Sequence, residues 1–408
     1  MPTIPALPRP VYLRQRRNFL RPDKSASVVG QTAEVWLLRS RTAQSVLIGE
    51  AAISRQSAKV RRIDQVIVLS AKIPWFGYHS GEMAMLSQLS RLTRARVIYP
   101  CVTFPRRCLG KLHSQLRRWP ARNQYNSFAE LHAWLLYRTC RNSVLHLLRS
   151  EEHTHFLSLW ERPATNILGT IHLPVALWPE AYRKAVGRLS NAIVYFTAEI
   201  EKIGALMRRP NVTFVPLGAD TDFFKPELSK VSFTPRILYS GLYLRNEPML
   251  VRVVQSIFQK MPEIKFDLLV PAHHRQQSAL GPLAEHPAVT WHAGLDDEQL
   301  RELYQRSYLM LLPMNASGAN TAVVDALASG LPLVTTDVGG IRDYGGGTIF
   351  PLVANNDDDG MIALIEQYLA RRRWRDETAA NCRRFAEGHL TPQIVAQKHI
   401  EAYQELTA

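Results

Sequence analysis

Short apolar runs alternate with helical stretches along most of this chain, and this alternation constrains the fold more than any other feature. Runs such as residues 66–69 and 309–312 have the length of a strand. Strands of four to six apolar residues between helices predict parallel sheets that helices cover on both faces. No run reaches the eighteen apolar residues of a bilayer-spanning helix, so we expect no transmembrane segment.

The alternation occurs twice, which predicts an α/β chain with two doubly wound, Rossmann-like domains facing across a cleft. In the first domain, residues 63–216, we expect strands at 66–70, 95–99, 143–147, 166–170, 192–196 and 212–215, with helices at 82–93, 128–138 and 180–189. A proline-containing linker, 217–235, follows. In the second domain, residues 236–390, we expect strands at 237–240, 265–270, 289–292, 308–312 and 333–336, with helices at 248–259, 296–307, 321–329, 360–371 and 375–387. A last helix, 391–408, closes the chain.

Positive charge is concentrated in the first half of the chain. Residues 1–217 contain 32 Lys and Arg against 12 Asp and Glu, whereas the remainder contains 18 against 23. A basic domain is expected to lie against an anionic partner, such as a membrane surface, a lipid-linked pyrophosphate, an acidic glycan or nucleic acid. A solvated basic surface without a partner is the alternative.

Residues 1–62 form a separate basic extension that is rich in proline at its start. It has no apolar core segment, so it is not expected to be a secretory signal; a membrane-surface arm, a docking segment and an organellar presequence remain open. The four cysteines, Cys101, Cys108, Cys140 and Cys382, lack the spacing of zinc ligands and are too few for a disulfide framework. They are expected to be thiols in a reducing cytoplasm.

A loop of small residues, 316–320, leads into the helix predicted to start at Thr321. Free backbone N–H groups at the positive end of such a helix suit a phosphate group. Asp325 lies one turn further on the same face, where it could accept hydrogen bonds from sugar hydroxyls. An ordinary helix cap at Asn320, with Asp325 favouring the helix dipole, explains the same residues equally well.

The stretch 324–340, VDALASGLPLVTTDVGG, closely resembles the carboxyl-terminal signature of retaining nucleotide-sugar glycosyltransferases with the GT-B fold, a family 4-like group. Two further segments match in the expected order. VPLGADTDFF at 215–224 is similar to the interdomain linker of that family, and ILYSG at 237–241 to the first strand of its nucleotide domain. FGYHSG at 76–81 and GTIHLP at 169–174 resemble a bacterial subgroup with a His-Ser-Gly loop. The resemblance covers residues 63–405.

This resemblance implies a donor site in the second domain. Its expected residues are Gly241, Arg245, Ser317, Gly318, Ala319, Asn320, Thr321 and Asp325. The family usually has two glutamates eight positions apart, where this chain has Ser317 and Asp325. It also usually has an Arg and a Lys after the first strand of the nucleotide domain; Leu242 stands at the Arg position, which leaves Arg245 as the clear cation for a diphosphate.

In the first domain the resemblance points to His172 as the histidine that contacts the donor sugar, and to His79, Ser80 and Gly81 as an acceptor or phosphate loop. A structural histidine and a tight turn are the alternatives at these two places. The catalytic residues are therefore expected to be His172 and Arg245. Clusters such as Asp357–Asp359 are read as helix-capping acids, and no metal or cofactor is expected.

The function expected from these features is transfer of a sugar from a nucleoside diphosphate sugar to a glycan, glycolipid or lipid-linked acceptor, with retention of configuration. The enzyme is expected in the cytoplasm, with a peripheral contact between its basic half and an anionic membrane. Two alternatives stay open: a scaffold that binds nucleotide sugars without turnover, which Ser317 and Leu242 favour, and a sugar-nucleotide epimerase. Nucleic acid is not an expected partner, because no recognition module is present.

Overall fold

The structure is a computed structural model that describes residues 63–71, 77–100, 108, 124–153, 166–178, 180–208, 211–275, 278–318 and 320–406. The basic extension 1–62 lies outside the described residues, as do Ala319 and residues 72–76 before the His-Ser-Gly loop. The interpretations of these segments therefore stay predictions.

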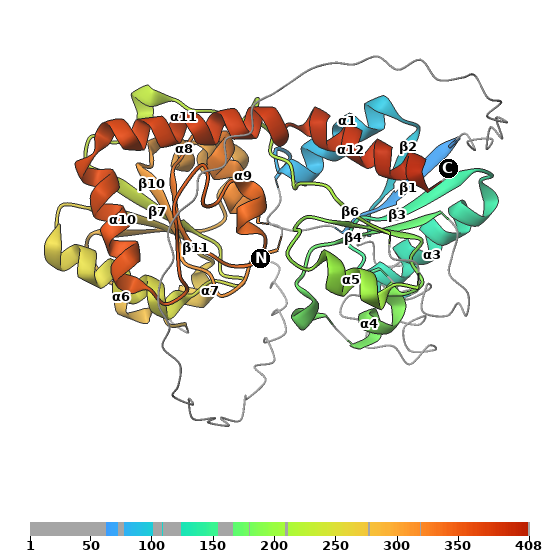
Figure 1. The fold of residues 1–408 in the computed structure, drawn as a ribbon, viewed down its shortest axis with the longest axis horizontal. Coiled ribbons are helices and arrows are strands. Elements are labelled where there is room, and N and C mark those ends of the chain that lie inside the picture. Colours follow the sequence, from blue (N-terminus) through green and yellow to red (C-terminus); the bar gives the residue numbers. More distant parts are fainter. Residues whose placement is uncertain are drawn as a thin grey trace, which may run out of the picture. The chain divides into compact units, whose positions relative to one another are not determined.

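Within the described residues, the first domain contains a parallel sheet of six strands in the order β2-β1-β3-β4-β5-β6 (Figure 1). Its strands are β1 (Gln65–Leu69), β2 (Ala95–Ile98), β3 (Ser143–Leu147), β4 (Ile167–Ile171), β5 (Asn191–Val194) and β6 (Val212–Phe214). Its helices are α1 (Gly81–Leu92), α3 (Gln124–Thr139), α4 (Glu180–Val186) and α5 (Ile200–Leu206), with a short 3₁₀ turn η2 (Val175–Leu177). Every residue of β3, β4 and β5 is buried, as expected for strands covered on both faces.

The second domain repeats this design with the order β12-β11-β10-β7-β8-β9 among the described residues. Its strands are β7 (Arg236–Ser240), β8 (Lys265–Leu269), β9 (Val289–His292), β10 (Leu309–Leu312), β11 (Leu333–Thr336) and β12 (Leu352–Val353). Its helices are α6 (Glu247–Lys260), α7 (Ala272–Arg275), α8 (Asp297–Arg306), α9 (Thr321–Ala328), α10 (Asp358–Ala370) and α11 (Arg372–His389), with 3₁₀ turns η4 (Gly281–Leu283) and η5 (Gly339–Tyr344). The two-residue strand β12 was not predicted, since it is too short to produce a periodic signal.

The segment between the sheets, which contains the 3₁₀ turn η3 (Leu228–Lys230), packs more tightly than a linker composition suggests. Leu217, Ala219 and Phe224 are each at most 4% exposed and belong to the main core. The Ala219 N–H donates to the carbonyl of Leu390 at 2.8 Å, just before the last helix. The chain between the domains is therefore a structured part of the protein.

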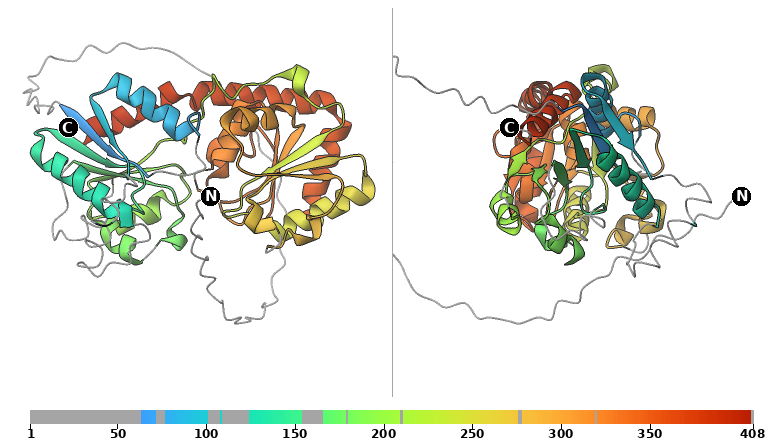
Figure 2. Two further views of the ribbon diagram at one scale, coloured as in Figure 1. Left: turned by 180° about the vertical axis from the view of Figure 1, so that it is seen from behind. Right: turned by 90° about the vertical axis from the view of Figure 1, so that its right-hand side faces the viewer.

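The last helix, α12 (Pro392–Glu405), returns to the first domain and packs along α1, as the views from two sides show (Figures 1 and 2). Its Tyr403 hydroxyl lies 2.8 Å from Nδ1 of His146 in β3. Because α11 packs on α9 of the second domain, the two closing helices tie both sheets together. Among the helices of the described residues, none combines the length and apolarity that crossing a bilayer requires.

Candidate functional site at the strand ends

The first sheet reverses its strand order at β1 and β3, which lie side by side although α1, β2 and α3 separate them in sequence. Ligands in sheets of this kind bind beyond the carboxyl ends of the strands at such a switch point. Ser70 follows β1 and Arg149 follows β3 at this edge. Both reach Glu82 in the first turn of α1: the Ser70 hydroxyl donates to Oε1 at 3.1 Å, and an Arg149 Nη2 group donates to Oε2 at 2.7 Å.

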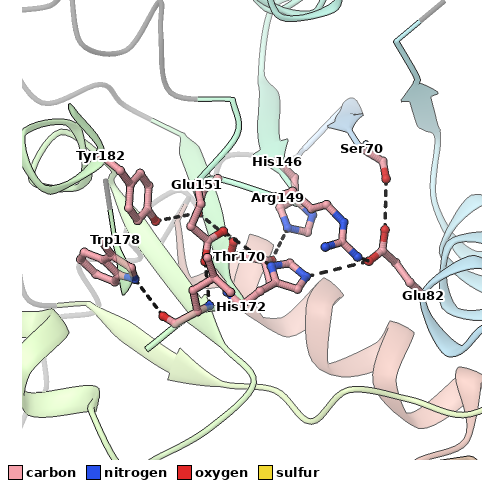
Figure 3. A network of polar contacts seen from close by, with 11 residues as sticks. Ser70, Glu82, His146, Arg149, Glu151, Thr170, His172, Trp178 and Tyr182 are labelled. Carbon is pink, nitrogen blue, oxygen red and sulfur yellow. Dashed lines mark hydrogen bonds and ion pairs between the residues drawn. The ribbon is translucent and has the colours of Figure 1, made fainter. Parts of the chain in front are cut away.

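A second carboxylate, Glu151, holds the end of the neighbouring strand β4 (Figure 3). Its Oε1 atom accepts the backbone N–H groups of His172 at 2.6 Å and Leu173 at 2.9 Å. Its Oε2 atom lies 3.7 Å from His172 Nδ1, while Glu82 Oε2 lies 3.9 Å from Nε2 on the other side of the ring. These separations are ion-pair distances but are too long for hydrogen bonds. The imidazole is therefore between two carboxylates.

The charges of this cluster shift one another's pKa values. Burial and Arg149 both act to lower the pKa of His172, but Glu151 and Glu82 outweigh them and raise it. Burial acts to raise the pKa of Glu82, yet Arg149 and His172 lower it overall. The pKa of Glu151 is lowered in the same way, mainly by His172 against the effect of burial. The cluster thus contains two carboxylates with lowered pKa values, an imidazole with a raised pKa, and the guanidinium of Arg149.

The loop before α9 in the second domain lies directly against this strand end. A Cβ added to Gly318 would lie 2.3 Å from the carbonyl oxygen of His172 and 3.3 Å from the ring of Phe196. Ser317 is 3% exposed, and its carbonyl accepts the Gly340 N–H at 3.0 Å. Because Gly318 has no side chain, the start of α9 can lie next to His172. Gly318 and His172, both named among the expected site residues, therefore lie side by side. Thr321 begins α9, and Ala319 lies outside the described residues.

Asn320 precedes α9 but does not cap it with its side chain. Its Oδ1 atom instead lies 3.4 Å from Nη2 of Arg245, and its Nδ2 group contacts the sulfur of Met314. An N-cap side chain normally satisfies one of the free N–H groups of the first turn. The predicted alternative of a side-chain cap at Asn320 is therefore wrong. The N–H groups of Val323 and Val324 donate to the carbonyl of Asn320, so the N–H groups of Thr321 and Ala322 are the ones left for another acceptor.

Arg245 follows β7 and points back across the end of that strand. Its Nε group donates to the carbonyl of Ser240 at 3.0 Å and an Nη1 group donates to the carbonyl of Tyr243 at 3.2 Å. Gly241, with φ of +87°, leaves room for the guanidinium: an added Cβ would lie 3.0 Å from Nη2. Burial lowers the pKa of Arg245. No carboxylate among the described residues pairs with this cation, so its charge remains available to an anion.

Asp325 is the buried carboxylate of α9. The residue is 6% exposed, and its Oδ1 atom has no hydrogen-bond partner in the part of the chain that the structure describes. Burial, together with the nearby charges of Asp297 and Asp220, raises the pKa of Asp325 well above its ordinary value. A buried carboxyl without a partner costs free energy, which a ligand hydroxyl could recover by donating to it.

The His-Ser-Gly loop lies against the interdomain segment and α8. His79 Nδ1 lies 2.7 Å from Asp220 Oδ2, its ring stacks on Phe223 at 3.7 Å, and its backbone N–H donates to Asp297 at 3.1 Å. A Cβ on Gly81 would lie 1.8 Å from the carbonyl oxygen of Gly218. Ser80 Oγ is buried with no partner among the described residues. The contacts of His79 and Gly81 are thus with the protein, and their proposed acceptor role is still a prediction.

Sequence reasoning missed Glu82, Arg149 and Glu151. The available signal was position: Glu82 directly follows the His-Ser-Gly loop, and Arg149 and Glu151 stand two and four residues after the predicted strand 143–147. Recognising them required the strand order, which places the ends of β1, β3 and β4 next to one another.

Comparisons with known proteins show which proteins this chain resembles. Residues 234–371 match the family model of glycosyl transferases group 1. A curated relative, MMP alpha-(1->4)-mannosyltransferase of Mycolicibacterium hassiacum, is 25% identical over 198 residues. The match covers 48% of each chain, so this chain aligns with about half the length of that relative.

Solved structures share the two-domain architecture. Sucrose-phosphate synthase of Thermosynechococcus elongatus superposes with a TM-score of 0.63 at 14% identity, covering 84% of this chain and 99% of that one. HepE of Anabaena, in complex with UDP and glucose, gives a TM-score of 0.64 at 13% identity, with the same coverage of 84% and 99%. The fold is that of the GT-B glycosyltransferases, two facing doubly wound domains as predicted, and the second domain matches the group 1 family of glycosyl transferases.

Proposed function

We propose that this protein is a retaining glycosyltransferase that moves a sugar from a nucleoside diphosphate sugar to an acceptor without a bound metal or cofactor. The observation that carries the proposal is the approach of Gly318, at the start of α9, to the carbonyl of His172. At this point a helix N-terminus without a side-chain cap, which suits a phosphate, adjoins a charged strand end. The group 1 match over residues 234–371 supports the same donor class.

Departure of a nucleoside diphosphate from the anomeric carbon develops negative charge on the leaving oxygen. Preorganised dipoles and cations stabilise such charge more effectively than water does, because they need not reorient. Here the first turn of α9 and the guanidinium of Arg245 supply the dipole and the cation. The Asp325 carboxyl accepts hydrogen bonds from ribose hydroxyls, and Gly241 and Ser317 allow close approach of the donor.

Retention follows, in this proposal, from attack of the acceptor on the face that the leaving group vacates. The departing phosphate accepts the proton of the acceptor hydroxyl, so no separate general base is required. Closure of the two domains brings His172 onto the donor sugar. In this proposal His79, Ser80 and Gly81 contribute to acceptor binding.

The acceptor in this proposal is a glycan, a glycolipid or a lipid-linked intermediate. The support is the excess of Lys and Arg in residues 1–217. Such an excess attracts anionic surfaces, and each basic residue near an anionic membrane contributes about 1 kcal/mol. The enzyme is then cytoplasmic, with a peripheral contact on the inner face of the membrane.

A nucleotide-sugar binder without turnover is the second candidate. It is favoured by Leu242 and Ser317, which stand where the family has charged residues. A sugar-nucleotide epimerase would use the same donor site but has no need for a basic partner domain.

Nucleotide release separates these candidates. The purified chain is incubated with the sugar conjugates of UDP, GDP and ADP, with and without EDTA, and free nucleotide is measured. The transferase predicts slow release from one conjugate, unaffected by EDTA and accelerated by the right acceptor, with the product anomer read by proton NMR. Binding without release favours the silent binder, and an isomerised conjugate favours the epimerase.

A further inference from the structure

Glu151 combines two kinds of contact with one residue. One carboxylate oxygen accepts the backbone N–H groups of both His172 and Leu173, and the other faces the imidazole at 3.7 Å. The first pair of contacts fixes where the chain leaves β4. The second places a negative charge beside the ring that this backbone carries (Figure 3).

The surroundings of the imidazole favour its cationic form. Glu82 from α1 faces Nε2 at 3.9 Å, and Arg149, which follows β3, neutralises Glu82 through a contact of 2.7 Å. The ring of Tyr195, which follows β5, lies edge-on with its centroid at 4.9 Å. Further titratable groups near the two carboxylates are Tyr182 of α4, on the side of Glu151, and Tyr99 after β2 and His399 of α12, on the side of Glu82. His146 of β3 also lies nearby, and it is buried and hydrogen-bonded to Thr170 and Tyr403.

The balance of buried charges explains why the His172 imidazole holds its second proton. Among the described residues, the two carboxylates face one permanent cation, Arg149, so a neutral His172 would leave one buried negative charge without an opposite charge. Burying an unpaired charge is expensive, and protonation of the imidazole removes that cost. Burial of the ring opposes protonation, but the two carboxylates outweigh it and raise the pKa of His172.

We propose that Glu151 is a positioning residue that, together with Glu82, holds His172 as a fixed imidazolium at the place where the loop of Gly318 meets the first domain. The carbonyl of His172 contacts the start of α9, so Glu151 also sets the distance between this cation and the helix end. The positive charge of the imidazolium then adds to that of the N-terminal end of α9. The role of His172 in sugar transfer rests on the function proposed above, but the charge state of His172 does not.

The direct test is the titration of His172 in the unliganded protein. Nitrogen-15 long-range correlation spectra of histidine-labelled chain resolve the ring signals, and a His172→Asn variant assigns the one of interest among the 13 histidines. In the wild type we expect His172 to titrate above the ordinary value of about 6.5. In Glu151→Gln we expect the midpoint to fall by roughly one to three pH units, the range for losing an opposite charge at 4–6 Å.

Glu151→Gln suits this test because the amide oxygen can still accept the two backbone N–H groups. Glu82→Gln should lower the midpoint as well, and Glu151→Asp, which keeps the charge, should retain an elevated midpoint. Glu180→Gln is the matched control, since this exposed carboxylate pairs only with Lys184 one turn along α4 among the described residues, and it should change nothing. Melting temperatures and the signals of the other histidines report whether each variant folds.

Two results would overturn the inference: a wild-type His172 that titrates at or below the ordinary value, or a midpoint that Glu151→Gln and Glu82→Gln both leave in place. Where turnover is measured, the basic limb of the kcat–pH profile should move to lower pH in Glu151→Gln with little change in donor KM. Absence of turnover with every donor would contradict the proposed function while leaving the titration result intact.

Discussion

A Cβ atom added to Gly318 would lie 2.3 Å from the carbonyl oxygen of His172, although 146 positions separate the two residues. The loop that opens α9 and the end of β4 therefore meet at a point that tolerates only hydrogen. Because the contacting atom belongs to the backbone, a side-chain rotation cannot relieve the clash.

Gly318→Ala should push the start of α9 away from His172. We expect a loss of about 1–3 kcal/mol in the free energy of unfolding, the usual cost of overpacking, and a larger proportional loss of donor binding. Urea denaturation and calorimetric titration with nucleotide measure the two effects. Gly281→Ala is the matched control, because nothing lies within 4 Å of its added Cβ. Equal behaviour of the two variants would contradict the close approach.

Asp325→Asn should stabilise the unliganded protein at neutral pH while weakening nucleotide binding. Burial raises the pKa of Asp325 in the folded state, so the folded protein holds this proton more tightly than the unfolded chain does. Its contribution to stability is therefore fully present below the unfolded pKa of about 3.9 and is lost as the pH rises through the folded value. The variant removes this loss, and thermal melts from pH 4 to pH 8 measure it. An unchanged melting temperature together with unchanged nucleotide affinity would exclude Asp325 from the site.

Arg245→Ala should weaken binding of a nucleoside diphosphate by about 1.5–3 kcal/mol, the scale of a charge-assisted hydrogen bond. Arg245→Lys should recover only part of this, since a lysine cannot hold the Ser240 and Tyr243 carbonyls and a diphosphate at once. Arg252→Ala in α6 is the control, because that half-exposed guanidinium pairs with Asp358 on the surface. Unchanged affinity in calorimetry would remove Arg245 from the donor site.

Acid should destabilise the packing of α12 on the first sheet and so lower the free energy of unfolding. His399 of α12 and His146 of β3 are buried with ring centroids 5.6 Å apart, and burial lowers the pKa of His399 to about 4 and that of His146 well below its ordinary value. Both histidines have a lower pKa in the folded protein than in the unfolded chain. Their contribution to the free energy of unfolding is therefore present above the unfolded pKa of about 6.5 and is lost as the pH falls toward the folded pKa values. His399→Leu should reduce the loss of unfolding free energy between pH 7 and pH 4 by roughly 3 kcal/mol. The surface variant His389→Leu should lose as much stability over this range as the wild type, and a His399→Leu profile that does the same would contradict this account.

Much of the fold could be predicted because its signals are local. Apolar runs gave β3, β9 and β11 to the residue, and the predicted capping role of Asp357 is confirmed by its acceptance of the Gly360 N–H. The loop before α9 was noticed because its residues are contiguous in sequence, although the side chain of Asn320 contacts Arg245 and does not cap the helix. By contrast, the Glu82–Arg149–Glu151 cluster depends on strand order, which brings together residues that no single motif contains. Packing of α12 on the first domain is equally non-local.

Binding of a nucleoside diphosphate tests the central claim most directly. Calorimetric titration of the wild-type chain and of Asp325→Asn with UDP, GDP and ADP compares the three bases under one set of conditions. The account predicts that one nucleotide binds the wild type selectively, that its sugar conjugate binds as well, and that Asp325→Asn weakens both. Absence of binding by all three nucleotides would contradict a donor site at α9 and with it the proposed transferase.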